Sequence, residues 1–308
     1  MTVSRKLTAV LVAQVLYSLG ATALPSPSSS ASSTSTLSAR GFPLLSDIPI
    51  PDALALSELY GAPDNDFDCA SERNPVVVLH GLSANRDVDL NLLQKALNAR
   101  GYCTFSQTWI GGLRDMAGSA ADIAAFVRAV RDRTGADRVD LVGHSEGGVQ
   151  ALYVPMTQDG IADMVGRVVA LGPAVHGADY YGFSDLWYVG GDVTRRLAKP
   201  FAALIACPAC EDMMPGGAIT DAFARAPKIA QDGNDVTVIM SRSDTLVSPD
   251  VSMIDEAGVN NVYVQDTCPD DKVGHAGLMW DKSVWRLIIN ALEENNDEVF
   301  PCEEGLEI

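Results

Sequence analysis

Residues Val139–Gly148 read Val-Asp-Leu-Val-Gly-His-Ser-Glu-Gly-Gly, and this stretch decides the fold. An apolar strand is predicted to run into Gly-His-Ser-Glu-Gly at 143–147, so Ser145, with Gly143 two positions before it and Gly147 two positions after it, lies where the strand gives way to a helix. This spacing is typical of a nucleophile elbow, a strained turn between a strand and a helix that lifts the serine hydroxyl above the sheet. Side chains at the glycine positions would collide with the neighbouring strand and helix. Because the pattern also arises by chance, the rest of the sequence must supply a base, an acid and an oxyanion hole.

Short apolar strands and amphipathic helices alternate along the chain around this stretch, and the sequence has no internal repeat. The predicted strands are 76–79, 103–105, 139–142, 165–171, 236–240 and 261–265. The predicted helices are 87–100, 119–133, 147–158 and 281–294. Strands that alternate with helices imply right-handed crossovers, so we expect an α/β fold with a mostly parallel, doubly wound sheet flanked by helices. In such sheets the functional residues lie at the carboxyl ends of the strands.

The base is one of four histidines. His80 belongs to a His-Gly-Leu turn after the first strand, His144 adjoins the serine inside the elbow, and His176 precedes every good acid candidate. His275 lies in a Gly-His-Ala-Gly loop between the last predicted strand and the last predicted helix. Chains with a nucleophile elbow place the histidine last, after the acid, so His275 is the predicted base.

The predicted acid is Asp244, because it follows the strand 236–240 in the segment Ser-Arg-Ser-Asp-Thr. Asp250 lies further along the same loop and is the alternative, whereas Asp270 and Asp271 are too close in sequence to the histidine. The acid would hold the imidazole in the tautomer that accepts the serine proton, and it would stabilise the imidazolium that follows.

Two backbone N–H groups are predicted to form the oxyanion hole. One belongs to Glu146, the residue after the serine, and the other to the loop after the first strand, most simply to Leu82. Losing one such donor costs about 3–4 kcal/mol of transition-state stabilisation.

The segment 172–229 breaks the alternation, because it is long and rich in glycine and proline. A loop of this length in a compact domain is usually a functional cover or binding segment. One interpretation is a cap whose aromatic side chains meet an apolar acyl chain, and the other is an insertion whose aromatic side chains pack for its own stability. The candidate substrate contacts are Tyr180, Tyr181, Phe183 and Trp187.

The first 23 residues have the features of a secretory signal peptide. Arg5 and Lys6 precede the apolar run 7–19, and an Ala-Thr-Ala segment then offers small residues to a signal peptidase. Residues 24–40 are mostly Ser, Thr, Ala and Pro, which predicts a flexible leader before a catalytic domain over 41–308. The apolar run is shorter than the roughly 20 residues of a membrane span. We therefore expect a secreted, extracellular protein without a transmembrane segment.

Composition suits a chain with a sizeable core, since 47% of its 308 residues are hydrophobic and 20% are charged. The net charge of −18 disfavours nucleic acid as a partner.

The six cysteines predict three disulfides in a secreted chain, although the sequence alone does not decide the pairing. The pairs that we predict are Cys69–Cys103, Cys207–Cys210 and Cys268–Cys302. The first and the last would tie a loop and a chain end back to the body of the domain. The segment Cys-Pro-Ala-Cys could instead be a redox motif, but no thioredoxin-type strand precedes it, and export favours a structural bridge.

With these residues placed, the sequence resembles the secreted class 2 lipases and esterases of the α/β-hydrolase superfamily, from about Pro75 to Cys302. The motifs that carry the resemblance are Pro-Val-Val-Val-Leu-His-Gly at 75–81, Gly-Tyr-Cys at 101–103, Asp-Leu-Val-Gly-His-Ser-Glu-Gly-Gly at 140–148, His-Gly at 176–177, Cys-Pro-Ala-Cys at 207–210, Asp244 before Val-Ser-Pro at 247–249, and Gln-Asp-Thr-Cys-Pro-Asp-Asp at 265–271 with His275 following.

The resemblance implies an α/β-hydrolase fold and hydrolysis of carboxylic esters through an acyl-enzyme on Ser145, assisted by His275 and Asp244. It also supports the disulfides 69/103 and 268/302. The sequence departs from the family at Glu146, where the family commonly has Gln. A carboxylate beside the nucleophile could repel anionic substrates or raise the pKa of a neighbour, so the family's substrate range is not carried over.

The sequence therefore predicts a secreted serine hydrolase that cleaves carboxylic esters, with lipid acyl esters favoured. This mechanism requires no cofactor and no metal. The expected partner is an ester or lipid substrate, a transient contact with a lipid interface is compatible with it, and the oligomeric state is open. One alternative is an acyltransferase or cyclising enzyme that uses the same acyl-enzyme. Another is a non-catalytic binding protein on a hydrolase scaffold, which predicts lost triad residues, whereas all three candidates are present.

Overall fold

The computed structural model describes residues 61–109, 112–178, 207–296, 298 and 300–302. The predicted signal peptide and leader lie outside these ranges, as does the part of the predicted cap from 179 to 206. The candidate contacts that fall in that part are Tyr180, Tyr181, Phe183 and Trp187.

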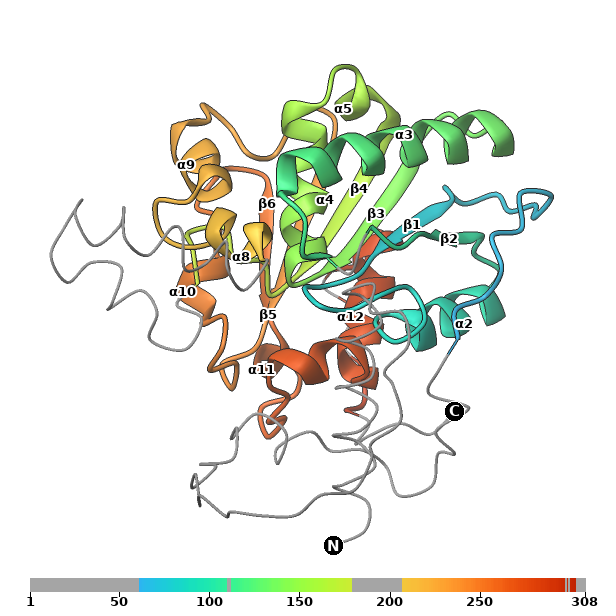
Figure 1. The fold of residues 1–308 in the computed structure, drawn as a ribbon. Coiled ribbons are helices and arrows are strands. Elements are labelled where there is room, and N and C mark those ends of the chain that lie inside the picture. Colours follow the sequence, from blue (N-terminus) through green and yellow to red (C-terminus); the bar gives the residue numbers. More distant parts are fainter. Residues whose placement is uncertain (1–60, 110–111, 179–206, 297, 299, 303–308) are drawn as a thin grey trace, which may run out of the picture. The chain divides into compact units, whose positions relative to one another are not determined.

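Six parallel strands form one sheet in the order β2-β1-β3-β4-β5-β6 (Figure 1). The strands are β1 (Val76–Leu79), β2 (Thr104–Ser106), β3 (Val139–His144), β4 (Val165–Leu171), β5 (Asp235–Met240) and β6 (Val259–Tyr263). The chain passes from β1 outward to β2 and then returns to place β3 on the other side of β1. The strand order therefore reverses between β1 and β3, and an open sheet of this kind binds ligands beyond the carboxyl ends of its strands at such a point.

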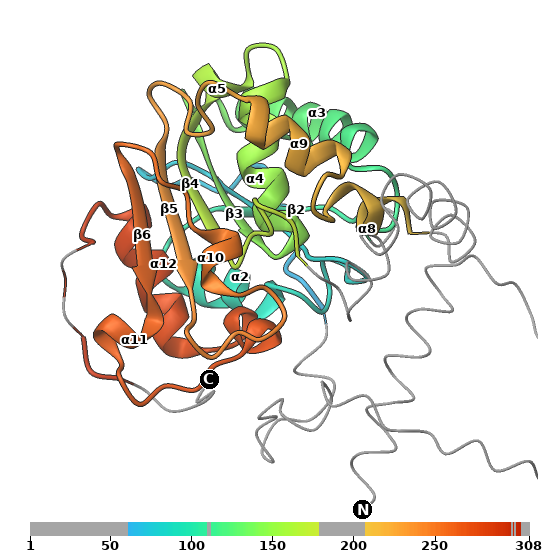
Figure 2. The same ribbon diagram turned by 90° about the vertical axis from the view of Figure 1, so that its left-hand side faces the viewer.

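Helices cover both faces of the sheet (Figure 2). The longer ones are α2 (Asn91–Ala99), α3 (Met116–Thr134), α4 (Glu146–Thr157), α9 (Ala218–Arg225) and α12 (Lys282–Leu292). The short ones are α5 (Ile161–Met164), α8 (Pro208–Asp212), α10 (Pro249–Ser252), α11 (Val264–Thr267) and the 3-10 helix η4 (His275–Met279).

Each face of the sheet has its own apolar core, because successive side chains of a strand point to opposite sides. Val76 and Val78 of β1 pack in the cluster that contains the apolar residues of α2 and α12. Val77 and Leu79 pack in the cluster that contains those of α3 and α4. The fully buried β1 thus reads as an uninterrupted apolar run, as expected of a parallel strand covered on both faces.

The predicted parallel, doubly wound α/β sheet is confirmed, but several predicted boundaries are shifted. The helix predicted over 119–133 begins at Met116, because the Asp115 side chain caps it by accepting the Gly118 N–H. The helix predicted from 87 begins at Asn91, because Asn85 and Asp89 accept backbone N–H groups of the preceding loop through their side chains. The strand predicted over 261–265 covers Val259–Tyr263, and the chain then turns into α11.

All six cysteines are paired as predicted, in Cys69–Cys103, Cys207–Cys210 and Cys268–Cys302. The Cα atoms of the three pairs lie 5.9, 5.3 and 5.6 Å apart, which is ordinary disulfide geometry. The Cys-Pro-Ala-Cys segment forms a bridge at the start of α8.

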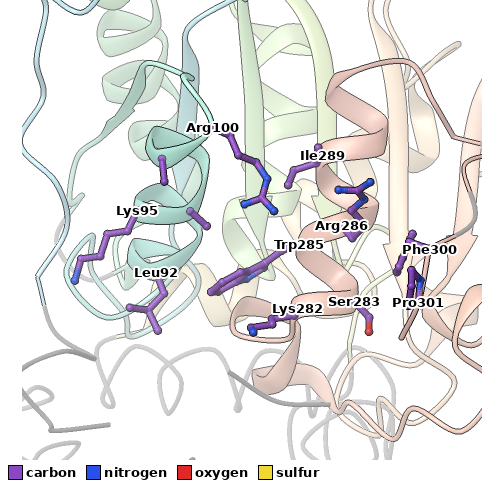
Figure 3. A pocket seen from close by; sticks show the side chains of 12 residues that line it. Leu92, Lys95, Arg100, Lys282, Ser283, Trp285, Arg286, Ile289, Phe300 and Pro301 are labelled. Carbon is purple, nitrogen blue, oxygen red and sulfur yellow. The ribbon is translucent and has the colours of Figure 1, made fainter. Parts of the chain in front are cut away.

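A cavity of about 470 Å³ lies between α2 and α12 (Figure 3). Leu92, Trp285, Ile289 and Phe300 give it apolar walls, and its basic lining residues are Lys95, Arg100, Lys282 and Arg286. None of its lining residues belongs to the candidate site. Within the described ranges, no helix has the length and the hydropathy of a membrane span.

Gly147 is where α4 approaches β1 most closely. A Cβ atom at this position would lie 2.1 Å from the carbonyl oxygen of Leu79 and 2.6 Å from that of His80. We expect Gly147→Ala to lower the free energy of unfolding by about 1–3 kcal/mol in urea denaturation, because backbone must move to admit the methyl group. Gly274→Ala is the control, since the φ of Gly274 is −92° and a Cβ atom there would lie 3.9 Å from the carbonyl oxygen of Ser243, an ordinary contact. Equal losses in the two variants would contradict the close approach.

Candidate active site

Ser145 occupies a strained turn between β3 and α4. Its φ of 55° and ψ of −119° lie in a region that side-chain-bearing residues rarely adopt. A Cβ atom at Gly143 would lie 2.1 Å from the carbonyl oxygen of Gly147, so both glycines of the motif are needed for the turn. The Ser145 N–H donates to the carbonyl of Leu171 at the end of β4 over 2.8 Å, which fixes the turn against the sheet.

The three side chains predicted to act together form one hydrogen-bonded line. The Oγ of Ser145 lies 2.9 Å from Nε2 of His275, and Nδ1 of His275 lies 2.6 Å from Oδ2 of Asp244. The other carboxylate oxygen of Asp244 accepts the N–H groups of Leu246 and Val247, both at 2.9 Å. Asp244 is therefore held by the loop after β5 while it holds the imidazole. The alternative acid, Asp250, is exposed in α10.

The environment of His275 favours its neutral form. Burial lowers the pKa of the imidazole, and it outweighs the opposing hydrogen bond and charge of Asp244. A neutral imidazole whose Nδ1–H donates to Asp244 keeps Nε2 as an acceptor. His275 can therefore take a proton from Ser145 at neutral pH.

A second buried pair, Asp89 and His144, connects the loop after β1 with the loop of His275. The carboxylate of Asp89 accepts the Gly81 N–H and lies 3.3 Å from Nδ1 of His144. The Nε2–H of His144 donates to the carbonyl oxygen of His275 over 3.0 Å. Burial lowers the pKa of His144. The charge and the hydrogen bond of Asp89 raise this pKa by more than burial lowers it, so the net shift is upward. A protonated His144 can donate from both ring nitrogens, as this arrangement requires.

The two predicted oxyanion-hole residues follow the carboxyl ends of neighbouring strands. Leu82 follows β1 after Gly81, and Glu146 is the first residue of α4. The strands β1 and β3 pair directly, with Leu79 opposite Gly143, so both loops start at the same level of the sheet. The first N–H groups of a helix have no partner inside the helix, which leaves that of Glu146 available to a ligand.

The Glu146 side chain points into the protein, where it is completely buried. Its Oε1 lies 3.3 Å from Nε1 of Trp109, and its Oε2 has no hydrogen-bond partner among the described residues. The Trp109 ring stacks on the ring of His80, with 3.7 Å between centroids and 11° between planes. Burial lowers the pKa of His80 to about 4, so His80 is neutral at neutral pH and its Nδ1–H donates to the Gly81 carbonyl.

Comparison with known proteins supports an α/β-hydrolase fold and shows that part of the chain is similar to lipases. A family model described as the α/β hydrolase fold matches residues 74–207, which is less than half of the chain. A triacylglycerol lipase of Pseudarthrobacter phenanthrenivorans is 30% identical over 122 residues, 37% of this chain and 37% of that protein. A triacylglycerol lipase of Burkholderia plantarii is also 30% identical over 122 residues, 37% of this chain and 33% of that protein. The chain thus aligns with about a third of the length of these relatives.

The crystal structure of Aspergillus fumigatus lipase B superposes with a TM-score of 0.61, covering 78% of this chain and 58% of that chain. The sequence identity is 15%, so this likeness concerns the fold. The chain has the α/β-hydrolase fold. Among α/β hydrolases it resembles the lipases and esterases at this general level, and its assignment to the secreted class 2 group stays a prediction.

Sequence reasoning did not identify the inner polar groups of this site, which are Asp89, His144 and Trp109. Asp89 lies within the helix predicted over 87–100, and no local pattern marks its contacts with Gly81 and His144. His144 adjoins Ser145 in the sequence, but its ring contacts Asp89. Within the described ranges, no group of His, Cys, Asp and Glu side chains is arranged to hold a metal ion.

The pKa values of His144 and His275 should lie on opposite sides of the ordinary histidine pKa. We expect the imidazole signals in NMR spectra to give His144 a pKa above about 6.5 and His275 a pKa below it. In Asp89→Asn the carboxylate charge is gone, so the pKa of His144 should fall, whereas the exposed control Asp68→Asn should leave it in place. An unchanged His144 titration in Asp89→Asn would contradict the buried pair.

Proposed function

We propose that this chain is a serine hydrolase that cleaves carboxylic esters through an acyl-enzyme on Ser145. The observation that carries the proposal is the line from Asp244 through His275 to Ser145, with 2.6 Å and 2.9 Å between the bonded atoms. A nucleophile that contacts a base, which in turn contacts a fixed acid, is the arrangement that activates a serine hydroxyl.

The reaction begins when Nε2 of His275 takes the hydroxyl proton of Ser145 as Oγ attacks the ester carbonyl carbon. The imidazolium is stabilised by Asp244, and the N–H groups of Leu82 and Glu146 stabilise the oxyanion. His275 then protonates the leaving alkoxide, which departs as an alcohol and leaves an acyl-Ser145 ester. Water that His275 deprotonates attacks this ester, and the same proton returns to Ser145 as the carboxylic acid leaves. Each proton thus moves between groups of this chain and the substrate, so the mechanism requires no cofactor.

Lipid acyl esters are the favoured substrates within this proposal. Two relatives that match part of the chain are named triacylglycerol lipases, and the aromatic residues of the predicted cap suit an apolar acyl chain. Three disulfides suit an oxidising compartment, which supports an extracellular site of action. The net charge of −18 favours neutral esters over anionic ones.

Removal of the nucleophile tests the proposal directly. We expect Ser145→Ala to lower kcat for p-nitrophenyl butyrate by roughly 10⁶-fold without changing the circular dichroism spectrum. Asp244→Asn should lower kcat by roughly 10⁴-fold, because the imidazole then adopts the wrong tautomer. Asp250→Asn is the matched control on the same loop and should keep most of the activity. Turnover of Ser145→Ala near the wild-type rate would overturn the assignment.

The pKa of His275 fixes the acidic side of the pH profile. Because burial lowers this pKa, the imidazole stays neutral until the pH falls below about 6.5. We expect kcat/KM for a neutral ester to be constant down to that pH and then to decrease as the imidazole is protonated and can no longer accept the serine proton. Profiles between about pH 4 and 8 measure this, and an inflection above the ordinary histidine pKa would contradict it.

A further inference from the structure

The side chain of Glu146 has no part in the mechanism above, which uses only the backbone N–H of this residue. The side chain is nevertheless enclosed beside the nucleophile, with no exposed surface. A carboxyl group in that position changes the charge of the site whenever it gains or loses a proton.

Contacts run from Glu146 to the loop after β1. The Trp109 indole N–H donates to Oε1 of Glu146 over 3.3 Å, and the indole ring stacks on His80 at 3.7 Å. The backbone N–H of Trp109 also donates to Nε2 of His80 over 3.4 Å. His80 in turn donates its Nδ1–H to the carbonyl of Gly81, the residue just before Leu82. The Glu146 carboxyl therefore contacts the loop after β1 indirectly, through Trp109 and His80, and this loop carries the Leu82 N–H.

The surroundings of Glu146 favour a neutral carboxylic acid. A single N–H group, that of Trp109, donates to it within the described part of the chain, and its Oε2 has no partner there. No described Lys, Arg or His forms an ion pair with it. Burial, and to a smaller degree the charge of Asp212, raise the pKa of Glu146 well above its ordinary value, although the Trp109 hydrogen bond opposes them.

Gly112 leaves little space around the Glu146 carboxyl. Its φ is +68°, and a Cβ atom there would lie 2.2 Å from Oε2 of Glu146 and 3.2 Å from the carbonyl oxygen of Gly81. The carboxyl thus has the Gly112 backbone against Oε2 and the Trp109 indole against Oε1. Close packing on both oxygens leaves an ionised Glu146 without the hydration that a carboxylate needs.

We propose that Glu146 is a positioning residue that works as a neutral acid. Its side chain holds Trp109 against His80 and so fixes the position of the loop after β1, which carries Leu82. The ionised form of Glu146 disables the oxyanion hole at alkaline pH. The inference rests on the proposed function, because it concerns the oxyanion hole of that reaction.

An ionised Glu146 would oppose the reaction through its charge. The backbone N–H of the same residue is a proposed donor to the oxyanion, so a carboxylate there would place a second negative charge close to the one that develops on the substrate. In a buried site two such charges repel strongly, and the transition state would lose stabilisation that the neutral acid leaves intact.

Several titratable groups face this region and must be kept apart in the test. Asp212 of α8 acts on Glu146 by its charge and accepts the Met116 N–H over 2.8 Å. His80, behind the Trp109 ring, has a pKa lowered to about 4 and does not titrate at alkaline pH. His275 contacts Ser145, and the Asp89–His144 pair contacts Gly81 and the His275 carbonyl. The Glu146→Gln variant lacks the titration of Glu146 and keeps those of the other groups, so a difference between its pH profile and that of wild type reports on Glu146 alone.

The experiment is the pH profile of kcat for p-nitrophenyl butyrate between about pH 6 and 10, in wild type, Glu146→Gln, Glu146→Leu and the exposed control Glu72→Gln. We expect kcat of wild type and of Glu72→Gln to decrease by up to tenfold per pH unit above the pKa of Glu146. Glu146→Gln cannot ionise and should lack this decrease, and its amide oxygen can still accept the Trp109 N–H. Glu146→Leu should lose kcat at every pH without an alkaline decrease, since it has neither the charge nor the acceptor.

Outcomes separate this inference from the proposed function. If neither wild type nor Glu146→Gln hydrolyses the ester at any pH, the proposed function fails. If both hydrolyse it and share the same alkaline decrease, or if wild type has none, the neutral-acid inference is overturned while the proposed function stands. An activity of Glu146→Leu equal to that of Glu146→Gln would overturn the positioning role through Trp109.

Unfolding measurements test the neutral acid without any substrate. A carboxyl whose pKa is raised in the folded state contributes full stability below its unfolded pKa and loses it as the pH rises to the folded pKa. The unfolding equilibrium constant of wild type should therefore increase relative to that of Glu146→Gln, by up to tenfold per pH unit, from about pH 5 upward. A constant ratio across this range would overturn the inference, because Glu146 would then titrate as an ordinary exposed carboxyl.

Discussion

The close approach of β3, α4 and β1 around Ser145 is the constraint on which the rest of the site depends. Glycine is required at 143 and 147 because a Cβ atom at either position would overlap backbone atoms at 2.1 Å. That contact holds Ser145 at a φ of 55° at the end of β3, where the strand order reverses next to β1. The loops that bring His275, Asp244 and Leu82 to the same place follow the carboxyl ends of neighbouring parallel strands, so the fold fixes their proximity.

Two buried polar systems contact the loop after β1. Asp89 and His144 join this loop to the loop of His275 through the Gly81 N–H and the His275 carbonyl. Glu146, Trp109 and His80 reach the same loop through the Gly81 carbonyl. A neutral Glu146 in the second system adds no negative charge beside the position where the oxyanion develops, which favours acyl transfer.

The sequence was sufficient to predict the sheet and the contact of Ser145, His275 and Asp244. Each of these residues follows a predicted strand, and the carboxyl ends of parallel strands meet at one edge of the sheet. The pairing of the cysteines was also predicted. Asp89 and Trp109 could not be found in this way, since their contacts join residues 55 and 37 positions apart in the sequence and no local pattern marks them. The departure at Glu146 was visible in the sequence, but its burial, and therefore its protonation, depends on tertiary packing.

The most direct test of the central claim is covalent labelling with a p-nitrophenyl alkylphosphonate, which mimics the ester and traps an activated serine. Mass spectrometry of the intact protein and of its peptides would locate the adduct. The account predicts one adduct per chain, on Ser145, with activity lost in proportion to labelling, and no adduct in His275→Ala. Labelling of a different residue, or full activity in a chain that is completely labelled on Ser145, would contradict it.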